Sequence, residues 1–456
     1  MSTAVTTKRA RGGFLRGAAV IAAGGFLAKL IGALYRIPLT NLIGGYGVGL
    51  YQLVYPFYCL LLTVSATGIP SSVARLTAKT RAEGNSTKPL FKTALWLFCL
   101  IGGVGTLLMV LLAPLLSRAQ DNPALTSGYI ALAPAVLLTS AISVFRGWFQ
   151  GRNAMTPTAV SEVVEQIVKV GFGLCFAYFY RADTLKAVTM LLLSVSISEA
   201  VALVGLIVAF TRVSAPFEGQ NAREKVSAKS VLKTSIPVTF ASALLPLSNL
   251  LDSVLLVRLM GRYTQNAVAL YGLFSGGAVT LINLPVSVCY GIAAALVPAN
   301  ASSGEDERGG KEAKRRLGFA LFVTVLISLP CAIGLALFAP LAVRLVFHAL
   351  TRAEQAVLVR LVRIFAVSAV TLSCVQTLSA SLTGLGNPAR SAHSMAVAVV
   401  VKTALEVFLV SRPVFSVYGA AIAADACYLV AFFLDLWYNL KECNKRLGRN
   451  YDEKRE

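Results

Sequence analysis

Residues 90–117 read LFKTALWLFCLIGGVGTLLMVLLAPLLS, an apolar run with a single charged residue, Lys92. A helix needs about twenty predominantly apolar residues to cross the hydrocarbon core of a bilayer, so this run predicts a membrane-spanning helix. Similar runs recur along the whole chain and predict about twelve spans in an all-α polytopic membrane protein. They lie near residues 14–35, 44–67, 90–117, 126–148, 159–180, 187–211, 232–257, 269–299, 317–345, 358–384, 391–411 and 416–440.

The composition also favours a chain surrounded by lipid. Hydrophobic residues make up 56% of the 456 residues, and charged residues make up only 14%. A soluble protein carries about 25% charged residues, because its surface has to face water. The apolar runs therefore leave no room for a soluble domain.

The net charge of +21 can arise from a nucleic-acid-binding surface or from the cytoplasmic loops of a membrane protein. If the N-terminus is cytoplasmic, 28 of the 42 Lys and Arg residues fall in inner segments and 11 in outer ones. This bias predicts a multi-pass protein of the cytoplasmic membrane with both termini in the cytoplasm and no nucleic-acid partner. The outer segment 344–363 carries four arginines and runs against the bias, so we expect an amphipathic or differently divided segment there.

The longest hydrophilic stretch divides the expected spans into two sets of six. Short motifs recur in the two sets, since Val48-Gly49-Leu50-Tyr51 resembles Val268-Ala269-Leu270-Tyr271. Such weak internal symmetry is typical of transporters, whose substrate site lies between the repeats. We expect an N-terminal six-helix lobe at 1–211, a cytoplasmic linker at 212–231, a C-terminal six-helix lobe at 232–440 and a basic cytoplasmic tail at 441–456.

Charged residues also lie inside the expected spans. A charge at the centre of a bilayer costs roughly 2.5–3.5 kcal/mol on insertion scales, so each one needs a partner or a purpose. This number of charges favours a protein with a water-filled interior. The residues are Lys29, Glu162, Glu165, Lys169, Glu199, Asp252, Lys402, Glu406 and Asp425.

Three cations predict a site for an anion. Lys29 and Arg36 are two helical turns apart on nearly the same face of the first span, and Arg258 is the counterpart of Arg36 in the second set. Facing one another, they would attract a phosphate. The alternative is that Arg36 and Arg258 extend to the membrane surface. Further polar residues expected along the cavity are Asn249, Asp252 and Asn283.

The fifth expected span carries Glu162, Glu165 and Lys169, which are spaced for one helix face. Glu165 and Lys169 are four residues apart, in the favoured order for an ion pair within a helix. Lys402 and Glu406 form a similar pair on the eleventh span. Two roles stay open for these residues, an ion pair that locks the helix bundle or the coupling of transport to an ion.

Nothing in the sequence is arranged for catalysis. There are two histidines, His348 and His393, and no metal-ligand spacing, phosphate-binding loop or nucleophile elbow. The eight cysteines include no C-x-x-C pair. We therefore expect no enzyme, no catalytic residue, no metal site and no cofactor.

Several short motifs resemble a known family. The sequence is similar to stage V sporulation protein B-like proteins, in the polysaccharide-transport branch of the multidrug/oligosaccharidyl-lipid/polysaccharide (MOP) exporter superfamily. The similarity is strongest over residues 13–82. The motifs that carry it are Gly13-Phe14-Leu15-Arg16-Gly17, Ala28-Lys29-Leu30-Ile31-Gly32, Tyr35-Arg36, Gly47-Val48-Gly49-Leu50-Tyr51, Gly68-Ile69-Pro70 and Val73-Ala74-Arg75-Leu76.

The resemblance implies two pseudo-symmetric six-helix lobes of MATE-like fold and transport by alternating access. Its implied substrate is an undecaprenyl-pyrophosphate-type lipid-linked saccharide, such as a peptidoglycan precursor of the cell envelope or the spore cortex. The family's cationic position in the first span falls on Lys29, and a second basic position falls near Arg36. Partners implied are the lipid-linked glycan, membrane lipids and a coupling ion, Na⁺ or H⁺.

The sequence departs from the lipid II flippases of the family in two respects. It lacks an arginine and an acid on the second span, and it has about twelve spans where those flippases typically have fourteen. The glycan is therefore left unnamed. Two rival functions remain, a cation-coupled multidrug antiporter of the same superfamily and a non-transporting scaffold of envelope or sporulation assembly.

Overall fold

The computed structural model describes residues 2–66, 68–213, 228–301 and 307–452. Side chains are described within these ranges except at 2–22, 29, 33, 228–241, 298, 307 and 447–452. The described chain is helical and contains no strand. Its elements are α1 (Ser2–Ala66), α2 (Ile69–Ala82), α3 (Lys88–Ala119), η1 (Pro123–Leu125), α4 (Thr126–Leu132), α5 (Pro134–Gly151), α6 (Thr156–Phe179), α7 (Thr184–Thr211), α8 (Ala228–Gly261), α9 (Ala267–Gly272), η2 (Leu273–Ala278), α10 (Val279–Ala301), α11 (Glu307–Val346), α12 (Arg352–Gly384), α13 (Pro388–Val410) and α14 (Ser416–Asp452).

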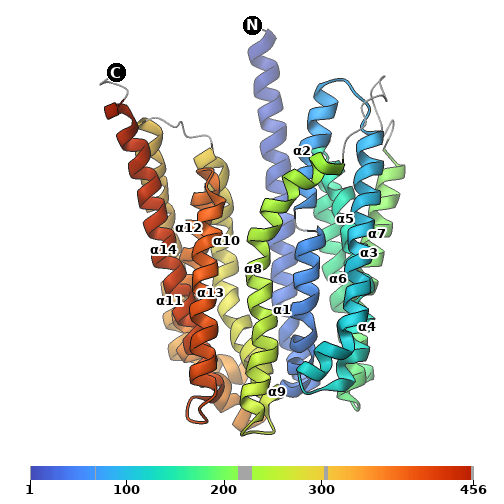
Figure 1. Cartoon of the computed structure of the whole chain (residues 1–456), viewed down its shortest axis with the longest axis vertical. Coiled ribbons are helices and arrows are strands. Elements are labelled where there is room, and N and C mark those ends of the chain that lie inside the picture. The colour runs from blue at the N-terminus through green and yellow to red at the C-terminus, as the bar shows by residue number, and fades with distance from the viewer. Residues whose placement is uncertain (1, 67, 214–227, 302–306, 453–456) are drawn as a thin grey trace. The chain divides into compact units, whose positions relative to one another are not determined.

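These helices agree with the expected spans (Figure 1). Ten stretches of the described chain are long and apolar enough to cross a membrane. One of them contains Gly44, whose φ of 70° breaks the helix, so α1 holds two successive helices. The ten do not include α6, which carries three charged residues. Counting α6 and both parts of α1 separately gives the twelve expected helices.

Packing divides the chain into two compact units. The first unit contains Met1–Tyr35 and Leu53–Leu250, and the second contains Arg36–Gln52 and Leu251–Glu456. This division falls within α1 and α8. The two expected six-helix lobes and the linker between them stay a prediction, and residues 214–227 of that linker lie outside the described chain.

Aromatic side chains form the core of the first unit. Phe91 of α3 stacks on Phe210 of α7 at 5.1 Å between ring centroids, and Phe145 and Trp148 of α5 pack edge-on or tilted against them. Helix α2 approaches α5 closely at Gly147, where a Cβ would lie 2.8 Å from a backbone oxygen of α2. This packing fixes α5, which carries one of the charged residues described below.

Both copies of the repeated motif lie in the second unit and contact each other. A Cβ on Gly49 would lie 2.1 Å from the carbonyl oxygen of Val268, and a Cβ on Gly272 would lie 2.2 Å from that of Gly45. The motif in α1 therefore packs directly on the motif in α9. Only glycine permits such a close approach of two backbones.

The segment around residues 344–363 is not a separate amphipathic helix. Helix α11 continues to Val346, and α12 begins at Arg352 after a short turn. The side chain of Thr351 accepts from the backbone of Glu354, and Glu354 bonds back to Thr351, which makes a capping box. Arg344 and Arg352 therefore lie at the ends of two spans, where long cationic side chains can reach water. Arg360 and Arg363 are exposed two to three turns further along α12.

Candidate functional site in two buried ion-pair networks

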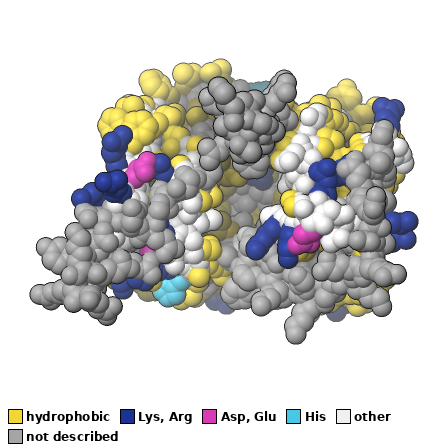
Figure 2. Space-filling view, turned by 90° about the horizontal axis from the view of Figure 1, so that it is seen from above, with side chains coloured by type: hydrophobic (Ala, Val, Ile, Leu, Met, Phe, Trp, Pro, Cys, Tyr) yellow, Lys and Arg dark blue, Asp and Glu magenta, His cyan; other side chains and the backbone are white. Residues whose placement is uncertain are grey.

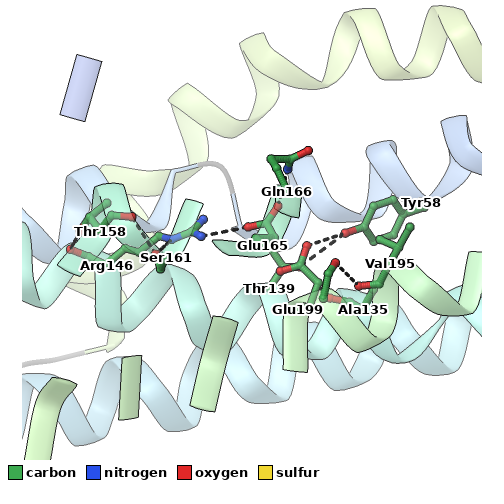
Figure 3. A network of polar contacts seen from close by, with 11 residues as sticks. Tyr58, Ala135, Thr139, Arg146, Thr158, Ser161, Glu165, Gln166, Val195 and Glu199 are labelled. Carbon is green, nitrogen blue, oxygen red and sulfur yellow. Dashed lines mark hydrogen bonds and ion pairs between the residues drawn. The ribbon is translucent and has the colours of Figure 1, made fainter. Parts of the chain in front are cut away.

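The first unit holds an ion pair between two helices (Figure 3). Nη2 of Arg146 on α5 lies 2.9 Å from Oε2 of Glu165 on α6, and the two side chains are only 12% and 16% exposed. Arg146 also donates through Nε to the Ser161 hydroxyl at 2.9 Å. The amide of Gln166 donates to the other oxygen of Glu165 at 3.0 Å. The charges of Arg146 and Glu165 therefore balance each other between α5 and α6.

This pairing differs from the sequence-based expectation. We expected Lys169, one turn further along α6, as the partner of Glu165, and we counted Arg146 among the cytoplasmic loop cations. The structure places Arg146 inside α5 and pairs it with Glu165. In the sequence, Arg146 follows an apolar run and so resembles a cation at the cytoplasmic end of a membrane span. Its partner became apparent only from the packing of α5 on α6. Glu162 and Lys169 are partly buried on α6.

A second carboxylate lies close to this pair. Glu199 on α7 is 4% exposed and accepts a hydrogen bond from the Tyr58 hydroxyl at 3.4 Å. Figure 3 shows the Tyr58 hydroxyl pointing toward both Glu199 and Thr139. The other oxygen of Glu199 accepts no hydrogen bond from any described residue. Glu199 also interacts electrostatically with Glu165, so the first unit holds two acids in one polar network.

The second unit contains a comparable group that joins residues 150 positions apart. Nζ of Lys402 on α13 hydrogen-bonds Oδ2 of Asp252 on α8 and lies 3.6 Å from Oε1 of Glu406, one turn along α13. All three residues are buried, with Glu406 at 0% exposure. We call Asp252, Lys402 and Glu406 the acid–lysine cluster. The expected proximity of Lys402 and Glu406 is confirmed, while the participation of Asp252 was not foreseen.

A polar cleft of about 300 Å³ lies elsewhere in the second unit, between the α12–α13 turn and α14. Arg390 Nη1 lies 2.7 Å from the Glu442 carboxylate, and Arg446 donates to the carbonyl oxygen of Leu385 at 2.8 Å. Figure 2 shows the molecule from above, and on this face some of the Lys and Arg side chains have Asp or Glu side chains beside them. The best-buried cations of this cleft are therefore already bonded within the protein.

Arg36 has a different environment from these cations. It is partly buried on α1, and its Nη1 donates to the Thr280 hydroxyl of α10 at 3.3 Å. No carboxylate of the described chain pairs with it. Arg258 is exposed near the end of α8. Lys29 lies in α1, but its side chain is outside the described part, so the site formed by the three cations stays a prediction.

The remaining predicted polar residues lie apart from these contacts. Asn249 is exposed on α8, and Asn283 is partly buried on α10. The sequence analysis missed Arg146 and Tyr58, and Tyr58 carried no signal because it lies within an apolar run. In the described chain no group of three or more His, Cys, Asp and Glu side chains is placed to hold a metal ion.

Comparison with known proteins agrees with this architecture. The sequence pattern of the family described as "Polysaccharide biosynthesis protein" matches residues 14–304. Stage V sporulation protein B of Bacillus subtilis (strain 168) is 27% identical over 423 residues, which cover 90% of this chain and 80% of that protein.

Two solved structures have the same fold. A multidrug resistance MATE family transporter of the MOP superfamily, in its inward-facing conformation, aligns with a TM-score of 0.76 at 16% identity, covering 92% of this chain and 96% of that one. The lipid II flippase MurJ, in its inward closed conformation, aligns with a TM-score of 0.72 at 13% identity, covering 94% and 90%. The first is described as a transporter and the second as a flippase, as is a relative in Bacillus subtilis, and these descriptions agree with the expectation that the chain is not an enzyme. The chain therefore belongs to the polysaccharide biosynthesis protein family and is an all-α polytopic membrane protein with the fold of the MOP superfamily transporters.

Proposed function

We propose that this protein is a flippase that moves a lipid-linked saccharide across the cytoplasmic membrane by alternating access, with both chain termini in the cytoplasm. The substrate class is an undecaprenyl-pyrophosphate-type precursor of the cell envelope or the spore cortex. Membership of the polysaccharide biosynthesis protein family supports this substrate class. The relationship to stage V sporulation protein B supports a role in making the envelope or the spore.

The observation that carries the proposal is the environment of Arg36. Two other cations within the helices, Arg146 and Lys402, each contact a carboxylate, so their charges are balanced within the protein. Arg36 contacts a hydroxyl group instead. A guanidinium in a membrane helix is costly unless an anion neutralises it. A diphosphate is suited to this role, because a guanidinium binds phosphate oxygens with two parallel hydrogen bonds.

The acids of the protein argue against the antiporter alternative. An organic cation needs carboxylates that are free to bind it. Glu165 is bonded to Arg146, and Asp252 is bonded to Lys402. Glu199 has one oxygen without a hydrogen-bond donor in the described chain, but it lies within the network of Arg146 and Glu165. The ion pairs of Glu165 and Asp252 therefore fit a protein whose transported charge is negative better than one whose transported charge is positive.

Transport in reconstituted liposomes tests the proposal. The full chain is incorporated with a fluorescent oligosaccharide linked through a diphosphate to a polyprenol, and a membrane-impermeant glycosidase is added outside. We expect the protein to raise the accessible fraction above the half exposed in protein-free liposomes. A parallel set loaded with a fluorescent organic cation should show no protein-dependent efflux.

Each outcome separates the candidate functions. Efflux of the organic cation with no movement of the saccharide would support the antiporter and contradict our proposal. Movement of neither compound by a folded, correctly inserted protein would favour the scaffold.

A further inference from the structure

The polar cleft between the α12–α13 turn and α14 carries an excess of positive charge. Its charged lining consists of Arg390, Glu442, Lys445 and Arg446, so three cations share one carboxylate and the net charge is +2. Arg390 Nη1 and Arg446 Nε lie 2.7 Å and 3.9 Å from the oxygens of Glu442. Lys445 forms no ion pair with a carboxylate of the described chain. The ion pairs within the cleft therefore use its only acid and leave two positive charges over.

The neighbouring helix α11 adds to this charge. Lys314 of α11 and Arg446 both interact electrostatically with Cys443, a buried thiol on the same part of α14. The acid of α11 in this region, Glu312, pairs with Arg316 on its own helix. The described residues around the cleft therefore leave its positive charge unbalanced. Cations that line a partly buried cleft produce a strong positive potential, which attracts an anion.

Aromatic side chains next to the cleft place it at the surface of the membrane. The α12–α13 turn and the last part of α14 lie at the same end of the second unit (Figure 1). Trp437, about two helical turns before Lys445, is half-exposed, and the ammonium of Lys441 lies 5.1 Å from its ring. The Tyr438 hydroxyl hydrogen-bonds Nδ1 of His393 at 3.1 Å. Trp and Tyr side chains gather where the hydrocarbon core meets water. The cleft, one to two turns further along α14, is therefore at the level of the lipid headgroups.

A ridge of exposed side chains connects the cleft to the apolar part of α14. Phe433, Trp437, Lys441 and Lys445 follow one another at intervals of four residues, and residues at this interval form a continuous ridge on a helix. All four are exposed, Phe433 by 62% and Trp437 by 53%. The ridge therefore runs from an apolar ring, through a ring suited to the interface, to two cations. A membrane lipid has the same order of acyl chain, glycerol and phosphate, whereas a free phosphate ion would use only the cationic end.

We propose that this cleft binds the phosphate headgroup of an anionic membrane phospholipid, whose acyl chain lies along the ridge of α14. Arg390 uses Nη1 for Glu442, and its other N–H groups have no acceptor in the described chain, so they can donate to phosphate oxygens. Lys445 supplies a second cation from the facing helix. Basic pockets between membrane helices recognise anionic headgroups in this way. The bound lipid joins the α12–α13 turn to α14, a role that does not depend on what the protein transports.

A cleft of the first unit shows that size alone does not make such a site. It has a volume of about 360 Å³ and lies between the end of α2 and the turn after α5. Arg81 is the only charged residue in its lining. A lipid phosphate presents several acceptor oxygens, so converging cations hold it much better than a single one does. We therefore expect the headgroup in the cleft of the second unit and not in this one.

Native mass spectrometry of the purified full chain tests the assignment, with dioleoyl phosphatidylglycerol and dioleoyl phosphatidylcholine as probes. We expect the anionic lipid to bind about tenfold more tightly than the zwitterionic one. Lys445→Glu brings the net charge of the cleft to zero and should weaken binding of phosphatidylglycerol about tenfold, while Lys445→Arg should retain it. The control is Lys88→Glu, which makes the same charge change at an exposed position of α3 and should leave binding unchanged.

The Lys445→Glu variant is expected to fold, because Lys445 is exposed, and thermal unfolding without added lipid checks this. Inorganic phosphate and glycerol phosphate, which lack an acyl chain, should not displace the lipid at equal concentration. Equal binding of the two lipids by the original chain would overturn the proposal, as would equal losses in Lys445→Glu and Lys88→Glu. Displacement by inorganic phosphate would assign the cleft to a soluble anion and overturn it as well. Because no saccharide is present, the result does not depend on whether the protein is a flippase.

Discussion

Breaking the ion pair between α5 and α6 should destabilise the first unit strongly. Arg146→Met would leave the Glu165 carboxylate only 16% exposed and without its cation. Removing one partner of a buried pair costs about 3–5 kcal/mol. The slight exposure places the expected loss near the lower limit, about 3 kcal/mol, which is roughly a hundredfold in the unfolding equilibrium.

The double variant separates the interaction energy of the Arg146–Glu165 pair from the other effects of each single substitution. Arg146→Met with Glu165→Met removes both charges and fills the space with side chains of similar volume. Such replacements are often neutral, so we expect stability within about 1 kcal/mol of the original chain. A double-mutant cycle should then give a coupling energy of several kcal/mol, well above the few tenths expected for independent sites.

The measurement is unfolding of the purified variants by sodium dodecyl sulfate in mixed micelles, followed by circular dichroism. Arg212→Ala is the control, because Arg212 is exposed at the end of α7, and it should change stability by less than about 0.5 kcal/mol. If the two single losses simply add in the double variant, the pair is not energetically coupled and the reasoning fails. Transport by the stable double variant shows in addition whether these charges serve function or only stability.

Two further predictions concern packing and topology. Gly49→Ala should destabilise the chain by about 1–3 kcal/mol, because its Cβ would meet the Val268 carbonyl. The control Gly103→Ala, with open space around the new Cβ, should not destabilise the chain. Thermal unfolding compares the two variants, and equal losses of stability would contradict the close contact at Gly49. A cysteine introduced at Glu83 should resist a membrane-impermeant thiol reagent in intact cells, because the charge bias places residues 75–92 in the cytoplasm. A cysteine introduced at Ala182 should be labelled by the same reagent. The reverse labelling pattern would contradict the proposed cytoplasmic location of the two termini.

The positions of the spans were predictable because each depends on a local property. An apolar run of sufficient length has one stable arrangement in lipid, a helix that satisfies its own backbone. The expected run at 159–180 was therefore close to the observed α6, Thr156–Phe179, despite its three charged residues. Helix ends with clear signals, such as the capping box at Thr351, could be found in the same way.

The partners of the buried charges were only partly predictable. Lys402 and Glu406 lie one helical turn apart, so their proximity followed from spacing alone. The pairing of Lys402 with Asp252, and of Arg146 with Glu165, depends on which helices pack together, and a single sequence carries no such information. Burial is equally hidden: Cys443 belongs to the expected basic tail, yet the packing of α14 buries it completely.

The central claim is that cations on the first span carry a lipid-linked anion across the membrane, and Lys29 tests it most directly. Transport of the fluorescent lipid-linked saccharide is measured in liposomes containing equal amounts of correctly inserted protein. We predict that Lys29→Ala abolishes transport and that Lys29→Arg retains part of it, because the charge survives. Arg36→Ala and Arg258→Ala should each be milder, and together they should approach the severity of Lys29→Ala. Full transport of the saccharide by Lys29→Ala would contradict the cationic mechanism.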